Sequence, residues 1–124
     1  MSIALYIAAL LLFLVGVAHS YLGERYILIR LFRREDLPKL FGGTQFTIRT
    51  LRFAWHITTI AWWGFAGLLV HLASGSISRN VVAMTIGITF LATGLVTLAA
   101  SRAKHLAWPV FILIGIISLW VGAT

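Results

Sequence analysis

Three histidines, at positions 19, 56 and 105, are the residues of this sequence best suited to chemistry. Imidazole nitrogens bind zinc, copper, iron and haem iron, and three histidines around an open position are a pattern of catalytic zinc sites. His19, His56 and His105 therefore predict a cofactor site for a metal ion or haem, provided that the fold brings them together.

Two arginines precede the central histidine. Arg49, Arg52, His56 and Trp63 fall at spacings of three, four and seven, which predicts that they share one face of a helix. Arginine binds carboxylates and phosphates through its planar fork of donors, and tryptophan supplies an apolar wall. We therefore expect a pocket for an anionic amphipathic ligand, with these ligand-binding residues: Glu24, Arg49, Arg52, Trp55 and Trp63.

The same residues also have a purely structural interpretation. Histidine and tryptophan are common anchors at a membrane interface, and none of the histidine spacings is a recognised metal motif. The chain has no cysteine, which excludes disulfides, thiolate ligands and cysteine nucleophiles. No charged residue lies in the middle of an apolar segment, which argues against a proton relay or an ion-coupled transporter.

The composition indicates a membrane protein. Of the 124 residues, 60% are hydrophobic and 10% are charged, compared with about 25% charged in soluble proteins. The net charge is +7, and the basic residues that produce it lie beside apolar segments. This position favours anionic phospholipid over nucleic acid as the partner.

Four apolar segments predict an all-α integral membrane bundle of four helices, forming a single transmembrane domain over residues 1–124. We expect helices at about 3–22, 46–73, 79–101 and 104–123, and a basic loop at about 24–45. Residues 24–34 are too apolar for a free loop, so this part is expected to continue the first helix or to lie in the membrane interface. His19 lies three residues before the end of the first helix, and His56 lies three residues after the second enters hydrocarbon at Phe53. Both therefore lie about 5 Å inside the same boundary, with His105 at the mouth of the fourth helix.

The basic residues predict the orientation. Nine of them lie in or beside the first and third connections, whereas the second connection holds only Arg79. The positive-inside rule then places the first and third connections in the cytoplasm and both termini outside, in the inner membrane.

Small and hydroxyl residues predict helix contacts. Gly16, Ser20 and Gly23 recur along one strip of the first helix, and similar strips hold Gly87 and Gly94, and Gly115, Ser118 and Gly122. In the third helix a hydroxyl recurs every four residues, at Thr85, Thr89, Thr93, Thr97 and Ser101. We expect these hydroxyls to donate to carbonyls of their own helix. Ser78 is expected to cap this helix.

Three functions are compatible with these features. The first is the cytoplasmic-side site described above, for a metal, haem or anionic amphiphile. The second is a non-catalytic accessory subunit or homo-oligomer, in which the glycine strips bind a partner. The third is a small enzyme acting on lipophilic substrates. The topology resembles that of the membrane enzymes of eicosanoid and glutathione metabolism, but Arg52, His56 and Thr59 stand where that group carries arginine, asparagine and glutamate.

Overall fold

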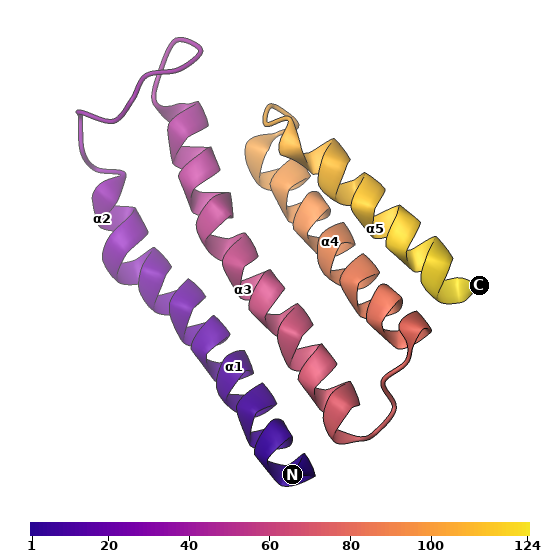
Figure 1. Cartoon of the computed structure of the whole chain (residues 1–124). Coiled ribbons are helices and arrows are strands. Elements are labelled where there is room, and N and C mark those ends of the chain that lie inside the picture. The colour runs from indigo at the N-terminus through magenta and orange to yellow at the C-terminus, as the bar shows by residue number, and fades with distance from the viewer.

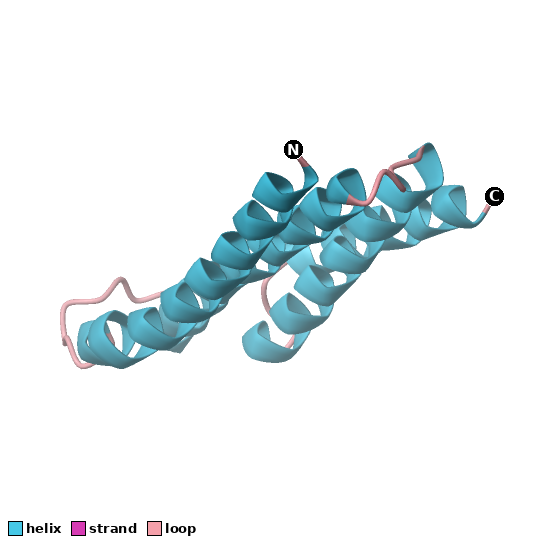
Figure 2. Ribbon diagram, turned by 90° about the horizontal axis from the view of Figure 1, so that it is seen from below, coloured by secondary structure: helices cyan, strands magenta, loops and turns pink.

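A computed structural model describes residues 1–124, and it contains helices and connecting loops only (Figure 2). The elements in chain order are α1 (Ser2–Leu22), η1 (Gly23–Leu28), α2 (Ile29–Leu31), α3 (Gln45–Ala73), α4 (Arg79–Ser101) and α5 (Ala107–Ala123). The first three elements follow one another without a break, as one helical rod of 30 residues. The predicted all-α bundle of four helices is confirmed.

The four rods pack side by side in the order of the chain (Figure 1). α3 contacts α1 on one side and α4 on the other, and α5 contacts α4 alone. α1 and α5 are therefore the two edges of an open arrangement and do not touch. The loop before α3 and the turn between α4 and α5 lie at one end, and the N-terminus and the loop between α3 and α4 lie at the opposite end.

The first connection is shorter than the basic loop expected at about 24–45. Its first part continues the first helix to Leu31, one of the two expected alternatives, through η1, a π-helix of six residues that the sequence did not indicate. The irregular segment is thus 32–44. It ends in a tight turn in which Leu40 and Gly43 pair, while Phe41 and Gly42 adopt positive φ angles of 55° and 87°.

Three rods are long and apolar enough to cross a membrane: Ser2–Leu31, Gln45–Ala73 and Arg79–Ser101. α5 is also apolar but has only 17 residues. Only 16 of the 124 residues are buried, and leucine, isoleucine and phenylalanine side chains cover the outer faces. Such a surface is unsuited to water, which indicates a multi-pass membrane protein.

The small residues lie where the helices approach one another. A Cβ on Gly16 would lie 2.7 Å from the Trp63 indole of α3, and one on Gly115 would lie 2.8 Å from the Leu91 backbone nitrogen of α4. The predicted glycine strips are therefore helix contacts, and the chain's own helices occupy them. The predicted cap of α4 is confirmed, since the Ser78 hydroxyl accepts the Val81 N–H at 3.2 Å.

Candidate functional site

A chain of polar side chains joins α1 and η1 to α3. We call these residues the α1–α3 network: Ser20, Glu24, Arg52, His56 and Thr59. The Glu24 carboxylate pairs with the Arg52 guanidinium and with His56 Nε2, both at 3.0 Å. His56 Nδ1 lies 3.0 Å from the Ser20 hydroxyl, which lies 2.6 Å from that of Thr59. Thr59 in turn donates to the Gly16 carbonyl at 3.2 Å.

The number of available protons constrains this network. Because the Thr59 hydroxyl donates to Gly16, Ser20 must donate to Thr59 and can only accept from His56. The bond between His56 Nε2 and Glu24 needs one further proton, on either the imidazole or the carboxyl group. All four hydrogen bonds therefore form together when His56 Nδ1 carries one proton and His56 Nε2 and Glu24 share another.

Two tryptophans of α3 also bind the backbone of α1. The Trp55 indole donates to the His19 carbonyl at 2.9 Å and stacks on the His19 ring, with centroids 4.5 Å apart and planes 2° apart. The His19 ring returns a hydrogen bond from Nε2 to the Trp55 carbonyl at 3.2 Å. The Trp63 indole donates to the Phe13 carbonyl at 3.2 Å. The two tryptophans thus hold α1 against α3, and Trp63 also lines an apolar cavity between these helices together with Phe13 and Ala66.

Arg49 and His105 lie near the turn between α4 and α5 and make no side-chain hydrogen bond or ion pair with the α1–α3 network. The His105 ring packs against Phe46 at 5.8 Å and Phe53 at 5.0 Å between ring centroids, and its Nδ1 accepts the Ala107 N–H. Arg49 and Arg52 lie about 60° apart around α3, on the same side of the helix, but their neighbours differ. Arg52 pairs with Glu24, whereas Arg49 lines a cavity with Ser101 and Lys104.

The predicted site residues therefore divide between two places. His19, Glu24, Arg52, Trp55, His56 and Trp63 lie at the contact with α1, whereas Arg49 and His105 lie toward the turn between α4 and α5. No group of three or more histidine and acidic side chains is close enough together to hold a metal ion. The geometry thus offers the three histidines no shared coordination site.

A basic cavity of about 180 Å³ lies at the start of α3. It is lined by the turn at 40–43, by Gln45, Phe46 and Arg49 of α3, and by Ser101 and Lys104 beyond it. Arg49 is half-buried and makes no ion pair or side-chain hydrogen bond in the structure. The sequence predicted Arg49 as a ligand-binding residue. It did not predict Ser101 or Lys104, although Ser101 is the last residue of the hydroxyl ladder and Lys104 belongs to the basic third connection.

A second, apolar groove of about 440 Å³ runs between α3 and α4. On α3 its lining extends from Ala54 to Leu68, and 14 residues of helix correspond to about 21 Å. On α4 it is lined by residues of the threonine ladder, including Thr85, Thr89 and Thr93. The groove therefore begins near the basic end of the molecule and extends well past the half-thickness of a bilayer core, about 15 Å.

The hydroxyl ladder of α4 has the predicted geometry at four of its five positions. Thr85, Thr89, Thr93 and Thr97 each donate to the carbonyl four residues earlier, at 2.7–2.9 Å. Ser101 departs from the pattern: its side chain is 2% exposed, and its hydroxyl has no hydrogen-bond partner.

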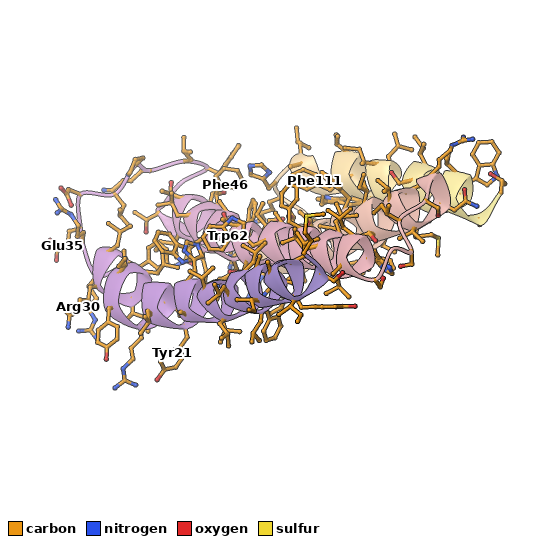
Figure 3. The ribbon with its side chains drawn as sticks, turned by 60° about the horizontal axis from the view of Figure 1, so that its bottom comes forward. Tyr21, Arg30, Glu35, Phe46, Trp62 and Phe111 are labelled. Carbon is orange, nitrogen blue, oxygen red and sulfur yellow. The ribbon has the colours of Figure 1, made fainter.

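Positive charge is concentrated at one end of the molecule. Nine basic side chains belong to the elements at this end, and only Arg34 and Arg52 have an acidic partner within 4 Å. Arg30 points away from the helices (Figure 3). In the loop, the hydrogen bond from Arg34 lowers the pKa of the Asp36 carboxyl, although both side chains are exposed. Seven cations thus remain without an acidic partner.

No family model matches the chain, and neither a curated protein nor a solved structure matches it. The function must therefore be inferred from the geometry of the chain itself.

Proposed function

We propose that this chain is a multi-pass protein of the inner membrane that binds an anionic amphipathic ligand of phospholipid type at its cytoplasmic side. The observation that carries the proposal is the group of seven cations without acidic partners at the end of the helices where the apolar groove begins. A headgroup at the basic end and an acyl chain in the groove would satisfy both features.

The orientation is part of the proposal. The end with nine basic residues faces the cytoplasm, the end with Arg79 faces outward, and α5 completes a fourth crossing. With 17 residues, α5 is at the lower limit of length for crossing a bilayer core. A locally thinner bilayer, or a Lys104 side chain that extends from the start of the helix to the headgroups, would accommodate this short length.

Electrostatics favours an anionic over a zwitterionic lipid. Each basic residue near an anionic surface contributes about 1 kcal/mol of attraction, and a half-buried arginine without a partner gains further from a charge-assisted hydrogen bond. The α1–α3 network adds little to this attraction, because Glu24 already pairs with Arg52 and His56.

Lipid retention tests the proposal. The protein is purified from membranes of equal phosphatidylglycerol and phosphatidylcholine content, and the retained lipids are counted by native mass spectrometry. We expect one or two phosphatidylglycerol molecules to remain after most phosphatidylcholine has been lost. Arg79→Gln, at the opposite end, serves as the control and should retain the same lipids. Equal retention of the two lipids by the wild-type protein would contradict the proposal.

A further inference from the structure

The basic cavity at the start of α3 combines several unsatisfied donors. The backbone N–H groups of Gln45, Phe46 and Thr47 have no hydrogen-bond partner, because they begin the helix and the Thr44 side chain does not cap them. Gln45 and Phe46 both line the cavity. A helix N-terminus carries roughly half a positive charge, which favours an anion at this position.

Two cationic side chains line the same cavity from different elements. Arg49 lies one turn into α3, and Lys104 comes from the turn after α4. Neither has an acidic partner within 4 Å, and no acidic residue lines the cavity. Two cations beside a helix N-terminus repel one another, and an anion bound between them would offset this repulsion.

Ser101 is an independent indication of a ligand. Ser101 lines the cavity and is 2% exposed, and its hydroxyl has no hydrogen-bond partner. The four threonines before it in the ladder all donate to their own helix, so the Ser101 hydroxyl is the one member left to donate elsewhere. A buried polar group without a partner costs about 1–3 kcal/mol, which a bound acceptor would recover.

The turn before α3 leaves room for the oxygen atoms of a bound ligand. A Cβ on Gly42 or Gly43 would meet no atom within 4 Å, so the turn is open toward its surroundings. The cavity volume of about 180 Å³ is far larger than the roughly 10–15 Å³ that a single water requires. It is large enough for a tetrahedral phosphate group with bridging water.

We infer that this cavity binds a phosphate group, held by Arg49, Lys104, the Ser101 hydroxyl and the free N–H groups at the start of α3. This inference specifies the headgroup site of the proposed function. It rests on that function only where the phosphate is taken to belong to a lipid. A soluble phosphate compound would use the same donors. The experiment therefore includes an arm for each source.

Three variants and two probes test the inference on the full-length protein. The variants are Lys104→Gln, Ser101→Ala and the control Arg102→Gln, whose side chain is in the same turn, is exposed and does not line the cavity. The probes are inorganic phosphate, titrated by calorimetry into protein in neutral nanodiscs, and phosphatidylglycerol, measured by native mass spectrometry.

We expect Lys104→Gln and Ser101→Ala each to weaken phosphate binding about tenfold, since each removes one donor to a charged group. Arg102→Gln should change it less than twofold. Ser101→Ala is the sharper variant, because removing an unsatisfied buried hydroxyl leaves the fold as stable as before or more so. A loss of affinity in a fully folded Ser101→Ala protein supports the site, and a thermal melt verifies the folding.

The two probes separate failure of the site from failure of the proposed function. If the cavity variants weaken both probes, the site holds a lipid phosphate. If inorganic phosphate binds more weakly to the two cavity variants than to Arg102→Gln, but phosphatidylglycerol is not preferred, the phosphate site is supported and the lipid-binding function is contradicted. If phosphatidylglycerol is preferred but the cavity variants do not differ from Arg102→Gln with either probe, the inferred site is overturned and the lipid function stands.

Discussion

Replacement of Gly23 by alanine tests how α1 is held against α3. Gly23 is the first residue of η1, and a Cβ built on it would overlap the Trp55 indole. The indole would have to move, and its hydrogen bond to the His19 carbonyl and its stack on the His19 ring would be lost or weakened. The substitution therefore acts on the contacts that position the α1–α3 network.

The expected magnitude combines opposing effects. Overpacking costs about 1–3 kcal/mol, and the lost hydrogen bond and ring stack cost about 0.5–1.5 kcal/mol each. These costs overlap, because one movement of the indole relieves the clash and breaks both contacts. Alanine in a helix gains back about 1 kcal/mol relative to glycine, and Gly23 has helical angles of −60° and −49°. We expect a net destabilisation of about 1–3 kcal/mol.

Gly67→Ala is the matched control. Gly67 is also helical, but a Cβ there would lie 3.5 Å from Thr85 Cγ2, an ordinary contact distance. Only the helix-propensity gain applies, so this variant should be stabilised by up to about 1 kcal/mol. Unfolding by sodium dodecyl sulfate in mixed micelles, followed by circular dichroism, gives both free energies. The indole N–H resonance of Trp55 should shift in Gly23→Ala alone. If Gly23→Ala is as stable as Gly67→Ala and its Trp55 resonance is unchanged, the reasoning is refuted.

Three further predictions concern other polar contacts. Glu24→Gln should destabilise the protein by about 1 kcal/mol, because its ion pair with Arg52 and its hydrogen bond with His56 are both partly exposed, whereas exposed Glu35→Gln should have no effect; equal unfolding midpoints would contradict this. Thr97→Val should cost less than about 1 kcal/mol despite complete burial, since its hydroxyl serves only its own helix, and a loss of several kcal/mol would indicate an interhelical role. The Asp36 carboxyl should titrate below its usual range of about pH 4, so the stabilisation from Arg34 is present above that pH and is lost as the pH falls through the lowered pKa. In carbon-13 NMR, Arg34→Gln should return the midpoint toward the usual value, and an unchanged midpoint would exclude the hydrogen bond as the cause.

Much of the fold follows from the sequence because lipid as solvent leaves few alternatives. Apolar runs must form helices that satisfy their own backbone groups, and small residues at regular spacing let two helices approach closely. These rules predicted the four helices, the Ser78 cap and the contacts of Gly16 and Gly115. They did not predict η1, because nothing in the composition of Gly23–Leu28 distinguishes a π-helix from an α-helix.

The candidate site was predicted less completely, for a geometric reason. The position of a residue along its helix can be read from the sequence, and His19, His56 and His105 all belong to segments at the basic end. The rotation of each helix about its own axis depends on which neighbours pack against it. Two of the histidines consequently lie at the contact with α1, while His105 packs against Phe53 on another face of α3.

The position of the phosphate relative to Lys104 is the most direct test of the account. The protein is labelled with nitrogen-15 on lysine side chains and placed in liposomes containing phosphatidylglycerol, and phosphorus–nitrogen dipolar dephasing is recorded by solid-state NMR. There are two lysines, Lys39 and Lys104, so Lys39→Gln leaves a single signal to assign. The account predicts dephasing of the Lys104 ammonium to the extent typical of direct hydrogen bonding, and weaker dephasing in Ser101→Ala, in line with the lower affinity expected of that variant. A Lys104 signal that phosphorus does not dephase, in liposomes where the protein is folded, would contradict it.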